Sequence, residues 1–70
     1  MDAKKVIEVL AGFDDTDGLM VWHMVDGEKV MSSVESKDDI DVYEHFIEVH
    51  VSKLDTVSIG YDELVSIEAA

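Results

Sequence analysis

The stretch from Leu19 to Ser36 constrains the fold more than any other part of the sequence. Two apolar runs rich in β-branched residues flank the turn Val25-Asp26-Gly27-Glu28-Lys29. Asp-Gly between such runs is a strong short-range signal for a β-hairpin, because the turn requires positive φ angles that glycine adopts without steric cost. We therefore expect strands over Leu19–Val25 and Lys29–Glu35, with the rest of the chain packed on this hairpin or extending it.

The first strand of this hairpin carries apolar side chains on both faces. Alternation places Leu19, Val21, His23 and Val25 on one face and Met20, Trp22 and Met24 on the other. This pattern predicts a strand covered on both sides, as in a closed barrel, a central strand or a subunit interface. We expect His23 to be a satisfied core or interface histidine. The methionines and Trp22 are expected in the core, and an adaptable binding surface is the alternative.

A chain of 70 residues holds a single domain, here residues 1–70. Such a small core gives marginal stability unless disulfides, a metal or oligomerisation add to it. The sequence contains no cysteine, which excludes disulfides and thiolate metal sites. We therefore expect an efficient small core, an oligomer, or a metal held by histidines and carboxylates.

The remaining chain is predicted as one short helix and three further strands. A helix over Ala3–Ala11, capped by Asp2 and ended by a left-handed Gly12, competes with a strand in the same segment. Alternation within Tyr43–Ser52 favours a strand, and a helix over Asp38–His50 is the competitor. Short strands are expected over the two segments Thr56–Ile59 and Leu64–Glu68.

Five short strands at close spacing predict a mainly β fold. We expect a small SH3- or Sm-like five-stranded barrel, or a curled antiparallel sheet, behind the possible N-terminal helix. An α+β class is the alternative. The segment Ser36–Asp41 is expected to be a loop or a helix start, with Ser36 as N-cap.

The charge balance is the strongest global feature of the sequence. Seventeen Asp and Glu stand against five Lys and no Arg, for a net charge of −12. Such a field attracts basic protein surfaces and makes nucleic acid an unlikely partner. Solubility or adaptation to high salt is the alternative explanation. The residues expected to bind a partner lie in three acidic segments: Asp14, Asp15, Asp17, Asp38, Asp39, Asp41, Asp62 and Glu63.

No motif specific for an enzyme is present, and we expect neither catalysis nor a cofactor. The Asp14–Gly18 loop fails the EF-hand spacing, and Glu48 with His50 would need a third ligand such as Glu44. The sequence therefore predicts no metal site. No apolar run is long enough to span a bilayer and the N-terminus is a poor signal peptide, so a soluble, cytoplasmic protein without membrane contact is expected.

Two groups of residues resemble the motifs of the Sm-like family, and most of all its bacterial Hfq branch. The first group comprises Val25-Asp26-Gly27, Lys29-Val30, Val34-Glu35-Ser36 and Asp38; the second comprises Thr56-Val57-Ser58, Tyr61 and Val65-Ser66. The resemblance covers residues 19–68, at positions that are common in hairpins. It implies a short helix before a bent five-stranded barrel, assembly into a ring, and binding of uridine-rich RNA.

Departures from the family pattern bear on the RNA-binding positions. Asp62 and Glu63 stand where the family has a Lys-His pair, and Ile40 stands where it has a base-stacking aromatic residue. The resemblance therefore implies a homo-oligomer whose RNA binding is weak or lost. Together with the two-faced first strand, it leads us to expect an oligomer interface that includes Trp22, Met24, Val57 and Ile59.

The sequence leads to one preferred hypothesis and two alternatives. The preferred hypothesis is a non-enzymatic acidic protein that docks on a basic protein surface. In its sharper form the protein is a nucleic-acid mimic, similar to inhibitors carried by phages and mobile elements. The alternatives are an Sm-like ring protein and a purely structural or designed domain; the absence of Asn, Gln, Arg, Pro and Cys is compatible with design.

Overall fold

The computed structural model describes residues 1–70, and its first element is helix α1 (Ala3–Ala11). Asp2 is the N-cap, and its carboxylate accepts a hydrogen bond from the backbone N–H of Lys5 at 2.8 Å. Val6 and Leu10 lie one turn apart and are buried. The predicted helix is confirmed over its full range, and the competing strand is wrong.

The end of α1 differs from the prediction. Gly12 has φ −81° and ψ −6°, so it is not the left-handed residue that we expected. The backbone N–H groups of Gly12 and Phe13 donate to the carbonyl oxygens of Val9 and Leu10, each three residues back. These bonds tighten the last turn and satisfy two free carbonyls, so no left-handed residue is needed.

Strands β1 (Leu19–Val25) and β2 (Glu28–Val34) form the predicted hairpin, in which Val25 pairs with Glu28. Asp26 and Gly27 have φ angles of 51° and 82°. Positive φ at both central residues defines the type I′ turn, whose twist matches that of the flanking strands. The hairpin prediction is confirmed, including its turn.

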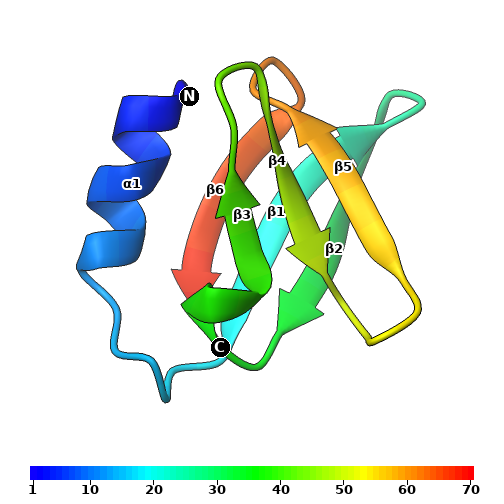
Figure 1. The fold of residues 1–70 in the computed structure, drawn as a ribbon. Coiled ribbons are helices and arrows are strands. Elements are labelled where there is room, and N and C mark those ends of the chain that lie inside the picture. The colour runs from blue at the N-terminus through cyan, green and yellow to red at the C-terminus, as the bar shows by residue number, and fades with distance from the viewer.

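The strands form two antiparallel sheets of three strands each (Figure 1). In the first sheet β6 (Leu64–Ala69) pairs with the free side of β1, which gives the order β2-β1-β6. The second sheet has the order β3-β4-β5, with β3 (Ile40–Val42), β4 (Phe46–His50) and β5 (Thr56–Gly60). A short 3-10 helix, η1 (Lys37–Asp39), capped by Ser36, connects the two sheets.

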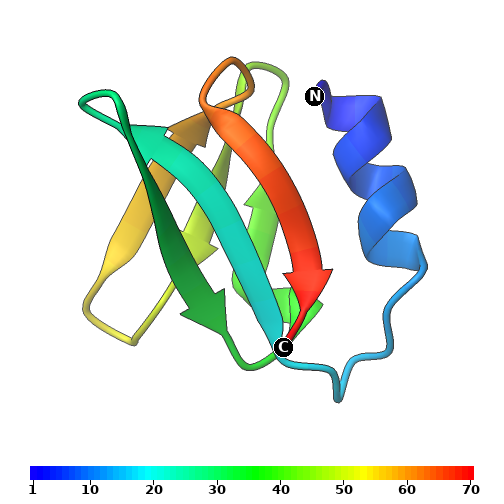
Figure 2. The ribbon, with the colours of Figure 1, turned by 180° about the vertical axis from the view of Figure 1, so that it is seen from behind.

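The expectation of a mainly β fold is confirmed, but the closed five-stranded barrel is wrong. The structure has six strands, because Ile40–Val42 forms a short strand where the sequence predicts a loop or a helix start. The two sheets share no ladder, and α1 lies along the side where β3 and β6 are neighbours (Figures 1 and 2). The competing helix over Asp38–His50 is also wrong, since most of that range is η1, β3 and β4.

A single cluster of eleven buried apolar side chains fills the space between the two sheets and α1. These residues are Val6, Leu10, Leu19, Val21, Val34, Ile40, Ile47, Val49, Ile59, Leu64 and Ile67. Every element except η1 contributes to this core. Burial of their side chains is the main source of stability.

Strand β1 is covered on one face only, which corrects the expectation that both faces are covered. Leu19, Val21 and His23 face the core, whereas Met20, Trp22 and Met24 are half-buried on the outer face of the first sheet. No element of the chain packs over that outer face (Figures 1 and 2).

The molecule has no helix with the length and apolar character needed to cross a membrane.

Candidate functional site

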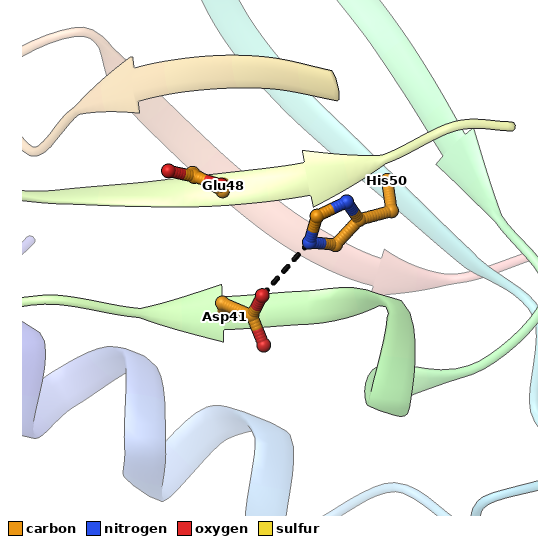
Figure 3. Close-up of side chains that lie close together, drawn as sticks. All are labelled: Asp41, Glu48 and His50. Atoms are coloured by element: carbon orange, nitrogen blue, oxygen red, sulfur yellow. Dashed lines mark hydrogen bonds and ion pairs between the residues drawn. The ribbon is translucent and has the colours of Figure 1, made fainter. Parts of the chain in front are cut away.

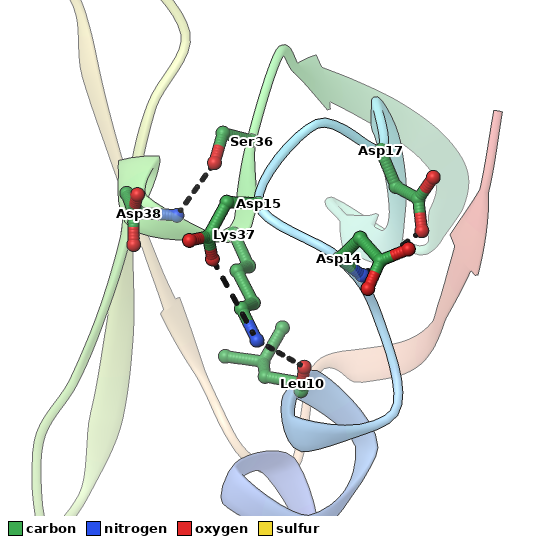
Figure 4. A network of polar contacts seen from close by, with 7 residues as sticks. All are labelled: Leu10, Asp14, Asp15, Asp17, Ser36, Lys37 and Asp38. Atoms are coloured by element: carbon green, nitrogen blue, oxygen red, sulfur yellow. Dashed lines mark hydrogen bonds and ion pairs between the residues drawn. The ribbon is translucent and has the colours of Figure 1, made fainter.

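Two of the acidic segments predicted to bind a partner come together at one end of the molecule (Figure 4). The loop between α1 and β1 supplies Asp14, Asp15 and Asp17, and η1 supplies Asp38 and Asp39. Lys37 joins the two segments, because its Nζ lies 3.8 Å from a carboxylate oxygen of Asp15 and 3.4 Å from the carbonyl oxygen of Leu10. We call these five aspartates the acidic end.

Local hydrogen bonds fix the shape of the acidic end. The carboxylate of Asp17 accepts from the backbone N–H of Asp14 at 3.0 Å, and the backbone N–H of Asp17 donates to the carbonyl oxygen of Asp14 at 3.0 Å, so two hydrogen bonds close the loop. Likewise, Ser36 Oγ accepts from the backbone N–H of Asp38 at 3.2 Å and caps η1. Asp17 therefore shapes its loop, whereas the carboxylates of Asp14, Asp38 and Asp39 have no hydrogen-bond partner in the chain.

The negative charge of the molecule is almost uncompensated. The contact between Lys37 and Asp15 is the single lysine–carboxylate pair within 4.0 Å, although the chain has 17 acidic residues. Of the other lysines, Lys29 lies over the ring of Trp22, with Nζ 5.1 Å from the ring centroid. Exposed carboxylates therefore dominate the surface potential.

The other predicted partner-binding residues lie elsewhere. Asp62 and Glu63 form the turn between β5 and β6, at the end opposite the acidic end (Figure 1). The carbonyl oxygen of Glu63 accepts from the backbone N–H of Met24 at 2.8 Å, which places this turn beside the end of β1. Asp41 lies on β3, on the outer face of the second sheet. The structure thus brings five of the eight residues together and separates three.

A polar cleft of about 650 Å³ lies beside the acidic end. Glu35 and Asp39 line one side of it, and His50, Ser52 and Lys53 line the other. The cleft thus extends from η1 to the start of the loop between β4 and β5. Its lining is mostly polar, so it suits a polar or charged group better than an apolar ligand.

A second cluster of polar side chains lies on the outer face of the β3-β4-β5 sheet (Figure 3). Asp41 pairs directly with Glu48 across the β3-β4 ladder, and His50 follows Glu48 on the same face of β4. The distance from His50 Nε2 to Asp41 Oδ2 is 2.8 Å, and His50 Nδ1 lies 3.0 Å from Thr56 Oγ1. We call Asp41, Glu48 and His50 the sheet-face triad.

The charges of this triad act on a neighbouring tyrosine. The pKa of Tyr43 is raised above its usual value, first by the negative charge of Glu48, then by desolvation and by the charge of Asp41. The ring of Tyr43 stacks on Phe46, with centroids 4.9 Å apart. A region of negative potential therefore covers this part of the sheet.

Sequence reasoning paired Glu48 with His50 and named Glu44 as a third member, but the structure supplies Asp41. Glu44 lies in the loop after β3, next to His45. The sequence names Asp41 only as a partner-binding residue, because the segment Ser36–Asp41 is expected to be a loop or a helix start. The signal was the matched alternation of Ile40-Asp41-Val42 and Ile47-Glu48-Val49, which a short hairpin brings face to face.

His23 is the buried histidine that the sequence predicts. It is 3% exposed, and its Nε2 lies 2.9 Å from Ser32 Oγ on the paired strand β2. Burial lowers the pKa of His23 below its usual value, and the charge of Glu63 acts in the opposite direction to a smaller extent. The core assignment of His23 is confirmed, and its ring is satisfied by the Ser32 hydroxyl.

The four residues expected at an oligomer interface do not form one surface. Trp22 and Met24 are half-buried on the outer face of the first sheet. Val57 lies on β5 and packs against the core, and Ile59 is a core residue that is only 1% exposed. Ile59 therefore offers no surface to a second copy, because Val57 and Ile59 share the inner face of the second sheet whereas Trp22 and Met24 share the outer face of the first.

No protein-family model matches the chain, and neither the curated proteins nor the solved structures include a significant match.

Proposed function

We propose that this protein is a non-enzymatic acidic module that docks through its acidic end on a basic surface of another protein. The observation that carries the proposal is that the loop between α1 and β1 meets η1 at one end of the molecule, where no lysine lies within 4.0 Å of Asp14, Asp38 or Asp39. Lys37 is the one lysine in this region, and its ammonium group is already paired with the carboxylate of Asp15.

The physical basis of docking is the attraction between this carboxylate cluster and lysines or arginines of a partner. Exposed charges of one sign steer a complementary surface into place and accelerate association more than they strengthen the final complex. The hydrogen bonds within the Asp14–Asp17 loop and at Ser36 fix the backbone from which these carboxylates project before binding. Such preorganisation lowers the entropic cost of binding.

The test compares two variants with equal charge changes at opposite ends of the molecule. The first carries Asp14→Asn, Asp38→Asn and Asp39→Asn, three residues whose carboxylates accept no hydrogen bond within the chain. The second carries Asp26→Asn, Asp62→Asn and Glu63→Gln. Each variant and the unaltered protein are immobilised, exposed to lysate of the source cells at low salt, and eluted with rising salt.

We expect the unaltered protein and the second variant to retain the same basic protein, and the first variant to lose it. Equal loss from both variants would mean that only net charge matters, which contradicts a defined docking end. Capture of no basic protein by the unaltered chain would contradict the proposal and favour a purely structural or designed domain.

The sharper form of the proposal is that the partner's basic surface normally binds nucleic acid. Carboxylates at a rigid end then take the places of backbone phosphates, which are also fixed negative charges. The test is competition between this protein and a duplex for the purified partner. Mutually exclusive binding supports mimicry, whereas simultaneous binding rejects mimicry and leaves docking intact.

The second candidate function is an Sm-like ring protein. It is supported by the order of elements, a short helix followed by a hairpin with an Asp-Gly turn, and by the unpaired outer edges of β2 and β5. Light scattering at high protein concentration tests it. A strict monomer rules out the ring, and the absence of any shift of uridine-rich RNA at low salt rules out the RNA function.

A further inference from the structure

The sheet-face triad has the composition and position of a metal site. Asp41 and Glu48 are direct cross-strand neighbours, and His50 lies two residues beyond Glu48 on the same face of β4. The alternating residues Ile47 and Val49 point into the core and fix the direction of the triad side chains. All three side chains therefore rise from a rigid sheet, on its outer face (Figure 3).

The distances within the triad suit a single ion. One potential ligand atom from each residue lies within 4.8 Å of the other two, and the distance from His50 Nε2 to Asp41 Oδ2 is 2.8 Å. Bonds from zinc to nitrogen and oxygen ligands are about 2.0–2.2 Å, so two ligands of one ion lie about 3–4 Å apart. The longer separations involve Glu48, whose side-chain torsions would change to bring its carboxylate into this range.

The imidazole of His50 is oriented from outside the triad. Thr56, on the neighbouring strand β5, places its hydroxyl oxygen 3.0 Å from His50 Nδ1. Without an ion, Nε2–H donates to the carboxylate of Asp41; with an ion bound, Nδ1–H donates to the Thr56 hydroxyl and the Nε2 lone pair binds the ion. A partner of this kind on the second ring nitrogen is usual for metal-binding histidines, because it fixes the tautomer and the ring.

The charge of the triad gives a separate reason to expect a cation. Like charges directly opposite one another across a ladder destabilise a sheet. No lysine lies within 4.0 Å of Asp41 or Glu48 to offset this repulsion. A divalent ion would offset it fully, since its two charges equal those of the two carboxylates.

We propose that Asp41, Glu48 and His50 form a binding site for one divalent transition-metal ion of the zinc class. Imidazole with carboxylates suits zinc, nickel and cobalt, whereas calcium and magnesium prefer oxygen ligands alone. Three protein ligands on an exposed sheet face leave a fourth position for water. His50 lines the same cleft as Asp39 of the acidic end, but Asp39 is not one of the three ligands, so the metal site does not depend on the docking proposal.

The test measures binding of Zn²⁺ to the full chain without a histidine tag, by isothermal titration, with Co²⁺ absorption as a second probe of the coordination geometry. We expect one Zn²⁺ per chain, with binding that survives an excess of Mg²⁺. Because each triad residue supplies a ligand, His50→Gln or Asp41→Asn should weaken Zn²⁺ binding at least about tenfold. Thr56→Val removes only the hydroxyl that orients His50, and it should weaken Zn²⁺ binding about tenfold or more.

The chain offers a matched control in Glu44 and His45, an exposed carboxylate and histidine 4.0 Å apart in the adjacent loop. The variant with Glu44→Gln and His45→Gln should bind Zn²⁺ as tightly as the unaltered protein. Equal weakening in this control, displacement of Zn²⁺ by Mg²⁺, or no binding by the unaltered chain would overturn the proposal. Should a triad variant fail to fold, Zn²⁺-induced NMR shifts of the unaltered protein decide: shifts centred on His50 support the site, and shifts spread over the acidic loops contradict it.

Discussion

His23 is the one polar residue inside an otherwise apolar core. A buried polar side chain destabilises a fold unless it is hydrogen-bonded, and Ser32 Oγ on the paired strand satisfies this need at 2.9 Å. The hydroxyl satisfies a neutral imidazole, but burial disfavours its charged form. The ionisation of this single residue is therefore linked to the stability of the whole domain.

The lowered pKa of His23 predicts a loss of stability in mild acid. The unfolded chain binds a proton near the ordinary histidine value of 6.5, whereas the folded chain resists protonation. The contribution of neutral His23 to the free energy of unfolding is therefore fully present above the unfolded-state pKa. It is lost as the pH falls through the lower folded-state pKa. The measurement is the free energy of unfolding between about pH 7.5 and about pH 5.

The comparison variant for this pH dependence is His23→Gln, which keeps a side chain able to bond Ser32 and removes the titration. We expect the free energy of unfolding of the variant to fall less on acidification than that of the unaltered protein. The two proteins differ in no other ionisable group, so the difference isolates His23. Parallel pH curves would contradict the assignment.

At the scale of elements, the two parts of the fold that the sequence predicts best are helix α1 and the β1-β2 turn. Both have local signals in a few neighbouring residues. Helix α1 has a cap that satisfies its free N–H groups, and the β1-β2 turn has two residues with positive φ. Gly27 is required there for its backbone conformation alone, because nothing lies within 4 Å of the position a Cβ would take. Gly12 has a negative φ and no such requirement.

This contrast predicts opposite outcomes for two similar substitutions. Gly27→Ala should lower the free energy of unfolding by about 1–2 kcal/mol, the cost of left-handed backbone for a residue with a Cβ. Gly12→Ala should leave it unchanged or raise it by up to about 1 kcal/mol, because alanine restricts the unfolded chain. Urea unfolding of both variants provides the measurement. Equal effects would contradict the role assigned to the turn.

The parts of the fold that sequence reasoning missed depend on pairing between distant residues. Strand β3 has three residues, so its alternation becomes informative only when it is matched to that of β4, where Ile40 and Val42 pair with Val49 and Ile47. The closed barrel was expected from the two apolar faces of β1, but apolar residues also remain half-exposed on the outer faces of small sheets.

The same contrast holds for the candidate sites. The residues that compose them were identified from the sequence, but their grouping in space was not. The acidic residues were evident in the sequence, but their grouping at one end depends on how Lys37 reaches Asp15 and Leu10 across the fold. Glu48 and His50 share a strand face and were paired from the sequence. Asp41 joins them only through the register of β3 against β4.

At the scale of the whole molecule, uncompensated negative charge affects both stability and association. The chain carries a net charge of −12, and one lysine–carboxylate pair offsets a small part of it. Self-repulsion of this kind destabilises the compact state, and dissolved salt screens it. The same screening weakens attraction to a basic partner. Salt should therefore act on folding and on binding in opposite directions.

For the free protein, the expected result is a Tm that rises as NaCl increases from about 20 mM to about 500 mM, because the Debye length falls over this range. Thermal unfolding followed by circular dichroism measures it. The variant with three neutralised carboxylates at the acidic end should show a smaller rise. A Tm that is independent of salt would contradict the view that repulsion is uncompensated.

The most direct test of docking through the acidic end is the salt dependence of affinity for the captured partner. We predict that binding weakens steeply between about 50 mM and about 500 mM NaCl, since exposed charges drive association. The dependence should be shallower for the variant with Asp14→Asn, Asp38→Asn and Asp39→Asn, and unchanged for the variant altered at Asp26, Asp62 and Glu63. An affinity that stays constant across this range would contradict the account.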